Sequence, residues 1–168
     1  MNEITYVTGD ATRPQGDGNM LIAHICNNIG AWGSGFVVAL SRRSTLPEQA
    51  YRLWHTEQPD YYEPFDLGNI QLAGFTHSHV LVANMIAQRG IRHSASAPPA
   101  VDYVALRGCL NKLGEKANAW GASVHMPRIG CGLGGGEWSI VEEAILESLT
   151  DIYGVSVTVY DLPSTVSI

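Results

Sequence analysis

Residues 130–136 constrain the fold of this chain more than any other segment, because five of these seven residues are glycine. The preceding residues 122–126 form a short apolar run that predicts a strand, and apolar side chains recur at helical spacing in residues 139–153. A glycine turn between a strand and a helix lets the backbone approach a ligand closely, and its free N–H groups favour phosphate. The pattern predicts a phosphate-binding loop, and a surface loop without a ligand is the alternative.

A second unit of the same kind lies near the N-terminus. Residues 20–26 form an apolar run broken only by His24, which predicts a strand buried on both faces. Residues 27–35 contain three glycines and lead into Phe36–Arg43, which is expected to start a helix. The chain therefore presents the strand–glycine loop–helix arrangement twice.

The rest of the chain alternates between predicted strands and helices. Strands are expected at Ile4–Thr8, 68–75, 80–87 and 155–160, and helices from Pro47 and over 101–120. The long helix is expected to bury a stripe made of Val104, Leu106, Leu110 and Leu113. The two strands at 68–75 and 80–87 are joined by the polar residues 76–78 and predict a hairpin. We therefore expect one α/β domain over residues 1–168, with a mixed sheet and helices on both faces.

Composition restricts the partners. The formal net charge of −6 argues against a broad nucleic-acid surface or an anionic-membrane surface. The three cysteines and six histidines are scattered and form no metal-ligand spacing, so no metal and no cofactor are expected. No signal peptide and no membrane-length apolar run are evident, which makes the cytoplasm the default location. The oligomeric state does not follow from the sequence.

Gly130, Gly132 and Gly135 match the spacing of the dinucleotide-binding fingerprint, GxGxxG. Only one strand is expected after them, which is too little for the rest of a nucleotide-binding half. The chain also lacks the lysine of a phosphate-binding P-loop. An NAD-dependent oxidoreductase is therefore disfavoured.

Five segments of the chain form a recognisable set: residues 9–12 (GDAT), 23–28 (AHICNN), 32–36 (WGSGF), 126–133 (MPRIGCGL) and 157–160 (VTVY). Together they resemble the macrodomains, a family that binds ADP-ribose. The likeness spans about residues 4–161 and is greatest to the branch that contains the human terminal ADP-ribose–protein glycohydrolase and the yeast ADP-ribose-1″-phosphate phosphatase. It implies a three-layer α/β/α fold with an ADP-ribose pocket at the mouths of the two glycine loops.

The resemblance also implies which residues contact the ligand. Asp10 would accept a hydrogen bond from the adenine amino group, and the backbone amide of Ala11 would meet the ring. Tyr160 either borders the adenine or fills the end of the sheet. The diphosphate and the distal ribose would lie between two sets of residues: Gly33, Ser34, Gly35 and Phe36 on one side, and Ile129, Gly130, Cys131, Gly132, Leu133 and Gly134 on the other.

The catalytic groups of the glycohydrolase branch are missing. In that branch an aspartate follows the Gly-Leu pair of the second loop, where this chain has Gly134, and its lysine falls near Ala87 or Gln88. A lysine-adduct mechanism is thereby excluded at those positions. The remaining catalytic candidates are His24, Asn27, Asn28 and Gln88.

Each of these candidates also has a structural interpretation. His24 is equally compatible with a buried core imidazole, and the two asparagines with turn formation. Arg128 is expected either to face the diphosphate or to form a structural ion pair, and Cys131 is interpreted as a small loop residue.

The resemblance implies hydrolysis of ADP-ribose derivatives. The preferred substrate is ester-linked ADP-ribose on Glu or Asp of modified proteins, because this labile bond can be cleaved by an oriented water. The alternatives are an ADP-ribose-1″-phosphate phosphatase and a non-catalytic ADP-ribose-binding module. The expected partner is ADP-ribose or an ADP-ribosylated protein.

Overall fold

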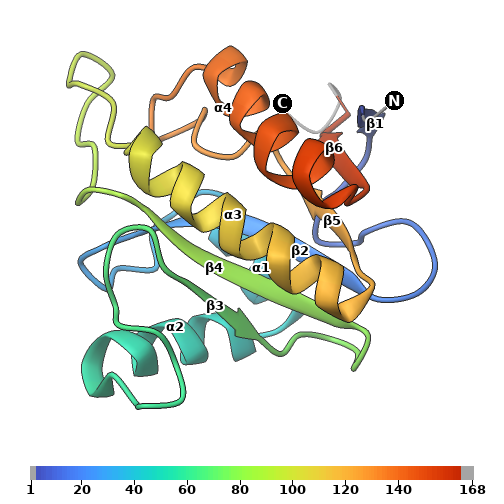
Figure 1. Ribbon diagram of the computed structural model, residues 1–168. Helices are drawn as coiled ribbons and strands as arrows, with labels where there is room; N and C mark the ends of the chain where they lie inside the picture. Colours follow the sequence, from blue (N-terminus) through green and yellow to red (C-terminus); the bar gives the residue numbers. More distant parts are fainter. Residues whose placement is uncertain (1–2, 164–168) are drawn as a thin grey trace.

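The structure, a computed structural model, describes residues 3–163 and is built on a six-stranded sheet with the order β1-β6-β5-β2-β4-β3 (Figure 1). Neighbouring strands are parallel except for the antiparallel pair β3–β4, so the expected mixed sheet and hairpin are confirmed. The strands are β1 (Ile4–Thr8), β2 (Met20–Asn27), β3 (Ile70–Ala73), β4 (Val80–Gln88), β5 (Ser123–Met126) and β6 (Val157–Asp161).

Helices cover both faces of this sheet, as the sequence predicted. They are α1 (Phe36–Arg43), α2 (Leu46–Glu57), α3 (Tyr103–Trp120) and α4 (Trp138–Ile145), which continues as the π-helix η1 (Leu146–Asp151). Alternate residues of β2 enter two different cores. Leu21 packs in the core beneath α3 and α4, whereas Ile22 packs in the core beneath α1 and α2 (Figure 1). The chain is therefore a three-layer α/β/α structure.

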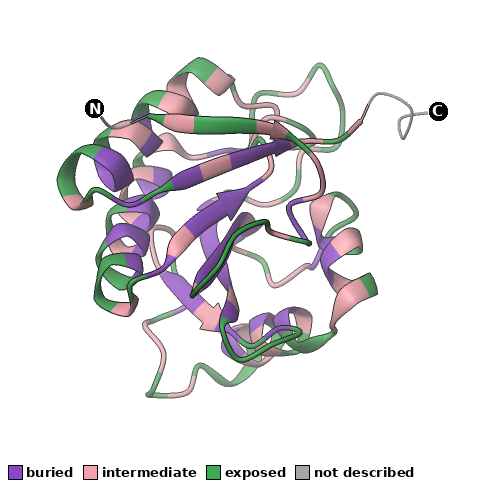
Figure 2. Ribbon diagram, turned by 90° about the vertical axis from the view of Figure 1, so that its right-hand side faces the viewer, coloured by how far each residue is buried: buried purple, intermediate pink, exposed green. Residues whose placement is uncertain are grey.

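Strands β5 and β2 lie at the centre of the six-stranded sheet. Every residue of β2 except Ile25 is buried, as the apolar run predicted, and Figure 2 shows the central strands mostly buried. Strand β1 lies at the edge of the sheet, and none of its residues is fully buried. The loops that follow β2 and β5 consequently start from the rigid centre of the sheet.

Helix α3 begins and ends at recognisable caps. The Asp102 carboxylate accepts a hydrogen bond from the Ala105 N–H at 2.9 Å, and Gly121, with φ +64°, ends the helix. Leu106, Leu110 and Leu113 are buried as predicted, but the inclusion of Val104 in the stripe was wrong, because its side chain is 83% exposed. The cap at Asp102 orients the first turn so that Ala105 and Leu106, not Val104, face the sheet.

The last helical segment differs from the single helix predicted over residues 139–153. After Ile145 the chain widens into the π-helix, whose backbone lies against α3 at Gly114. A Cβ atom on Gly114 would lie 2.8 Å from the carbonyl oxygen of Ser148 and 2.6 Å from the ring of Tyr153. The close approach of the two helices therefore depends on a glycine at this position.

Candidate functional site

Two glycine loops meet at one edge of the sheet. Loop 1 (residues 28–35) follows β2, and loop 2 (residues 127–137) follows β5, its parallel neighbour. A Cβ atom on Gly35 would lie 3.4 Å from Cδ1 of Leu133, so the tips of the loops are in contact. In open α/β sheets, the carboxyl ends of the strands are where ligands bind.

Backbone N–H groups at the two tips are free to bind a ligand. The N–H groups of Gly33, Ser34 and Gly35 in loop 1 and of Gly132, Leu133 and Gly134 in loop 2 have no hydrogen-bond partner within residues 3–163. Three other loop 2 amides are used within the loop: the N–H groups of Cys131, Gly135 and Gly136 donate to carbonyl oxygens of the same loop, the last at 2.7 Å to Gly130. Two sets of unpaired N–H groups on adjacent loops are a suitable environment for phosphate oxygens.

Asn27 holds loop 1 in shape. Its Oδ1 accepts from the N–H groups of Ile29 and Ala31 at 3.1 and 3.2 Å, and its Nδ2 donates to the Ala31 carbonyl at 2.6 Å. The Tyr51 hydroxyl donates to Asn27 from below, at 2.7 Å to the carbonyl and 2.9 Å to Oδ1. The contacts of Asn27 are those of a turn-forming residue, the structural interpretation considered for it.

His24 is a buried member of a polar ladder across three strands. Its Nε2 donates to Oδ1 of Asn84 at 2.6 Å, and Nδ2 of Asn84 donates to Oε1 of Gln71 at 2.9 Å. Burial lowers the pKa of His24 to about 4, so the imidazole is neutral at pH 7. The imidazole ring packs against the rings of Trp32 and Phe36, whose centroids lie 5.5 and 6.0 Å away. His24 therefore helps to position the residues of loop 1 and the start of α1 through these ring contacts. Its catalytic role stays a prediction.

Asn28 and Gln88 form a polar corner where β4 ends. Oδ1 of Asn28 accepts from the Gly90 N–H at 2.9 Å, and the Gln88 Nε2 donates to the Gly90 carbonyl at 3.0 Å. Nδ2 of Asn28 and Oε1 of Gln88 have no partner among the described residues. Oε1 of Gln88 lies 3.2 Å from the place that a Cβ on Gly134 would take, so this amide corner (Asn28, Gln88 and Gly134) joins both loops.

Loop 2 contributes its backbone more than its side chains. The side chain of Ile129 is buried in the core, and Gly130 has φ +74° and packs against Val101. Cys131 donates a weak hydrogen bond to the Ile129 carbonyl at 3.3 Å, and burial raises the pKa of its thiol. A raised pKa leaves little thiolate at pH 7, so the interpretation of Cys131 as a loop residue agrees with its environment.

Arg128 forms an ion pair on the outer side of loop 2. Its Nε and Nη2 donate to the two carboxylate oxygens of Asp161 at 2.8 and 3.0 Å. The guanidinium also lies over the rings of Tyr6 and Trp138, 5.1 and 5.2 Å from their centroids. Of the two expected roles for Arg128, the structure favours the structural ion pair.

Asp10 and Ala11 follow β1. Oδ1 of Asp10 accepts from the N–H and the hydroxyl of Thr12 at 2.9 and 2.7 Å, and Oδ2 accepts from Arg43 at 3.2 Å. Burial by itself would raise the pKa of Asp10, but these hydrogen bonds outweigh it and hold the pKa below its usual value. Ala11 is buried beside this carboxylate.

Tyr160 fills the end of the sheet next to this segment. Its hydroxyl accepts from the Gln15 N–H at 2.8 Å and bonds Nδ1 of His125 at 2.7 Å. A Cβ atom on Gly9 would lie 3.4 Å from the Tyr160 ring, so the ring also borders the residue before Asp10. Both positions considered for Tyr160 are therefore compatible with its place in the fold.

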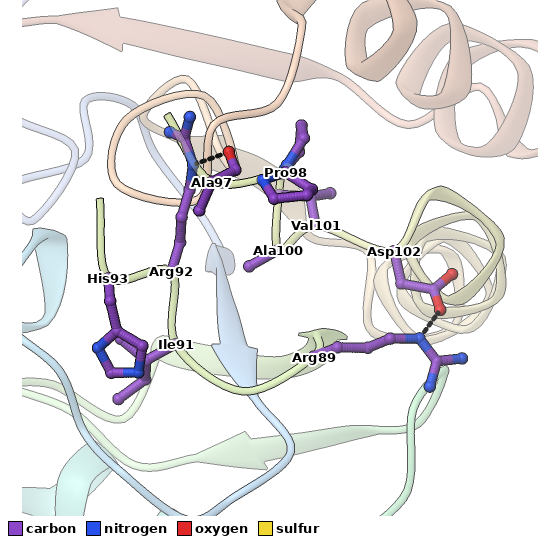
Figure 3. A pocket seen from close by; sticks show the side chains of 10 residues that line it. Arg89, Ile91, Arg92, His93, Ala97, Pro98, Ala100, Val101 and Asp102 are labelled. Atoms are coloured by element: carbon purple, nitrogen blue, oxygen red, sulfur yellow. Dashed lines mark hydrogen bonds and ion pairs between the residues drawn. The ribbon is translucent and has the colours of Figure 1, made fainter. Parts of the chain in front are cut away.

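Residues 89–102 also contribute to the site, although no sequence pattern predicted this. The Ala100 N–H donates to the Gly134 carbonyl at 3.0 Å, and the guanidinium of Arg92 occupies the space where Gly135 would carry a Cβ. This segment forms a pocket of about 390 Å³ beside loop 2 (Figure 3). The glycines of loop 2 were the available signal, since they allow another segment to pack closely.

Within residues 3–163, no three His, Cys, Asp or Glu side chains lie close enough together to hold a metal ion. No helix in the described part of the chain is both long and apolar enough to cross a membrane.

The chain is similar in sequence or in fold to several known proteins. No protein-family model matches the sequence. The mouse chromodomain-helicase-DNA-binding protein 1-like is 31% identical over 168 residues, which cover 95% of this chain but only 18% of the mouse protein. The DarTG structure from Thermosipho africanus, solved in complex with ADP-ribose, shares the fold at 18% identity and a TM-score of 0.65, over 86% of this chain and 38% of that one.

Two bacterial structures match almost the whole chain. A Bacteroides thetaiotaomicron protein of unknown function is 47% identical with a TM-score of 0.87, covering 96% of this chain and 99% of its own. A macrodomain protein from Streptomyces coelicolor is 46% identical with a TM-score of 0.81, covering 95% of this chain and 99% of its own. Identity of this extent over both full lengths, together with the three-layer fold and the paired glycine loops, shows that this chain belongs to the macrodomain family.

Proposed function

We propose that this protein binds ADP-ribose across the tips of its two glycine loops. The observation that carries the proposal is the set of six unpaired N–H groups, three on each loop, at a point where Gly35 and Leu133 are in contact. The diphosphate would accept hydrogen bonds from these amides, which bind an anion without a basic patch. That arrangement suits a chain with a net charge of −6.

The adenine and the distal ribose, at the two ends of ADP-ribose, would lie on opposite sides of the loop tips. Asp10 and Ala11 would hold the adenine, with Asp10 accepting from its amino group in addition to Thr12 and Arg43. The distal ribose would lie at the amide corner, where Nδ2 of Asn28 and Oε1 of Gln88 are free to bond its hydroxyls. The Thermosipho africanus complex with ADP-ribose, on the same fold, supports this class of ligand.

We further propose that the protein hydrolyses ester-linked ADP-ribose on Glu or Asp of modified proteins. Water would attack C1″ of the distal ribose, a C1″–O bond would form, and the bond from C1″ to the ester oxygen would break. The carboxylate leaves with the bonding electron pair, and the attacking water gives its proton to solvent. A carboxylate is a stable leaving group, so the reaction can proceed by orienting water and ribose without a strong nucleophile.

The four catalytic candidates would then have two kinds of role. Asn28 and Gln88 would contact the ribose and the attacking water, because each has one unpaired amide group at the corner. His24 and Asn27 would act as positioning residues, because their bonded atoms hold the floor and the turn of loop 1. The corner offers no general base. The rate would therefore lack the acceleration of about 10²- to 10⁴-fold that such a group typically supplies.

A non-catalytic binding module is the second candidate, favoured by Gly134, which offers no side chain at the position where the glycohydrolase branch has its aspartate. Calorimetry with free ADP-ribose and release of ADP-ribose from glutamate-modified protein separate the candidates. We expect one-to-one binding and slow release that EDTA does not affect. Binding without release would support the module, and phosphate release from ADP-ribose-1″-phosphate alone would support a phosphatase. A wild-type protein that fails to bind ADP-ribose would overturn the whole proposal.

The corner residues provide the matched variants. Asn28→Ala and Gln88→Ala should each slow release of ADP-ribose, with neither abolishing it. Asn118→Ala, on the exposed face of α3, is the control for an amide far from the corner. Total loss on changing one corner residue would show that this residue carries the chemistry by itself.

A further inference from the structure

The pocket beside loop 2 has a composition that the proposed ADP-ribose site does not use. It lies between residues 89–93, which follow β4, and residues 97–102, which lead into α3 (Figure 3). We call it the arginine pocket, because Arg89 and Arg92 line it together with His93. Its volume of about 390 Å³ lies near the lower end of the roughly 300–1,000 Å³ that ligand pockets have, and it is enough for one or two side chains of a partner.

The arginine pocket adjoins the amide corner. Three of its walls contact the corner or loop 2 directly: the Ala100 N–H donates to Gly134, Val101 packs against Gly134, and Arg92 lies on Gly135. The Gly90 N–H, between the two arginines in sequence, donates to Asn28. A group attached to the distal ribose at the corner would therefore leave the site toward this pocket.

Both arginines retain unpaired donors. Among residues 3–163, Arg89 has a hydrogen-bond partner only for Nε, which donates to Asp102 at 2.9 Å, and its side chain is 69% exposed. Arg92 donates from Nε to the Ala97 carbonyl and from Nη2 to the Ala95 carbonyl, which leaves Nη1 without a hydrogen-bond partner in the described chain. Figure 3 shows the two guanidinium groups turned to opposite sides, toward Asp102 and Ala97.

The pocket is locally cationic in an acidic protein. Asp102 is the one carboxylate among the lining residues, and it is already occupied, since it caps α3 and bonds Arg89. Two arginines against one aspartate leave a positive balance in a chain whose formal net charge is −6. Ile91, Pro98 and Pro99 add apolar surface beside the charges. Such a surface suits an anionic group carried on a peptide.

We propose that the arginine pocket recognises acidic residues flanking the ADP-ribosylated side chain, so that the substrate is an acidic peptide segment. The inference rests on the proposed function, because it assigns the acceptor side of the same substrate. Carboxylates beside the modified residue would pair with the free donors of Arg89 and Arg92. A nucleic-acid acceptor is disfavoured, because two arginines at one point do not form a basic track along a phosphate backbone.

The test compares two peptides that carry ADP-ribose on glutamate through a non-hydrolysable linkage, one with acidic flanks and one with neutral flanks. Affinity is measured by fluorescence anisotropy, so the result does not depend on turnover. We expect the wild type to bind the acidic peptide about threefold to tenfold more tightly, the range of a few exposed charge pairs. Arg89→Gln should remove most of this preference while leaving the affinity for free ADP-ribose unchanged.

Two further arms make the outcome decisive. Arg107→Gln is the matched control, since Arg107 also lies on the α3 side and pairs with a glutamate, Glu147, but does not line the pocket. Equal affinities of the wild type for the two peptides would overturn the inference and leave the proposed function intact. Displacement of the acidic peptide by a single-stranded oligonucleotide of equal charge would also overturn it, in favour of a nucleic-acid acceptor. If the wild type failed to bind free ADP-ribose, the proposed function itself would be wrong.

Discussion

Gly134 and Val101 are packed so closely that a Cβ atom on the glycine would lie 2.9 Å from Cγ2 of the valine. The carbonyl oxygen of Gly130 and Oε1 of Gln88 would lie within 3.1 and 3.2 Å of the same atom. The position where the glycohydrolase branch has its aspartate is therefore not an empty space in this chain. The segment before α3 has packed into it.

We expect Gly134→Ala to lower the free energy of unfolding by about 1–3 kcal/mol, because the new methyl group overpacks this contact. Adding Val101→Ala should recover part of the loss, so the double variant should be less destabilised than the sum of the two single variants. Urea denaturation of the four proteins gives the coupling energy.

Gly132→Ala is the control for this cycle. No atom lies within 4 Å of a Cβ placed on Gly132, and its φ is outside the left-handed region. The same substitution two residues away should therefore change stability by no more than about 0.5 kcal/mol. A Gly134→Ala variant as stable as Gly132→Ala would contradict the packing described for loop 2.

Gly132→Glu should abolish ADP-ribose binding and leave the fold intact. The open space around Gly132 accommodates a side chain, but the added carboxylate would stand among the N–H groups expected to hold the diphosphate. Gly74→Glu introduces the same charge at an exposed glycine outside both loops. Calorimetry and circular dichroism on both variants check the prediction, and normal binding by a folded Gly132→Glu would place the diphosphate elsewhere.

Asp10→Ala should weaken ADP-ribose binding substantially, whereas Arg43→Gln should weaken it much less. Both substitutions break the Asp10–Arg43 ion pair of 3.2 Å, but only the first removes the acceptor expected to meet the adenine amino group. Calorimetric titration of the two variants therefore separates a direct contact from a structural one. Equal losses would mean that the ion pair, and not the acceptor, matters for binding.

Stability should fall between pH 6.5 and about pH 4 because of His24. The unfolded chain binds a proton on this imidazole at its ordinary pKa of 6.5, whereas the folded chain does so only near pH 4. The unfolded state therefore binds more protons within this window, and the free energy of unfolding decreases as the pH falls. A shift of this size corresponds to about 3 kcal/mol.

His24→Gln removes the titrating group, so its unfolding free energy should vary less over the same window. His77→Gln, in the exposed turn between β3 and β4, should keep the wild-type slope. Burial also lowers the pKa of His125, so protonation of His125 destabilises the fold over the same pH window. The unfolding free energy of His24→Gln should therefore still decrease as the pH falls, but less steeply than that of the wild type. Parallel curves for wild type and His24→Gln would show that His24 is not the neutral buried group described above.

The amino-acid sequence by itself determined the order of the elements and the two glycine loops. β1 and α1 have the predicted bounds, and the buried character of β2 followed from an apolar run that only His24 interrupts. These features are local, since periodicity, caps and turn residues act over a few neighbouring positions. The glycines of residues 130–136 identified the loop for the same reason.

Only the tertiary structure decided which distant residues share a site. The Asp102 cap turned Val104 outward, and Gly114 admitted a π-helix where a regular helix was predicted. The contacts of Asp10 with Arg43, Gln88 with Gly134, and Arg92 with Gly135 join segments that are 33, 46 and 43 positions apart in the sequence. Such contacts depend on how the helices and loops pack on the finished sheet, and no local pattern of residues encodes that packing.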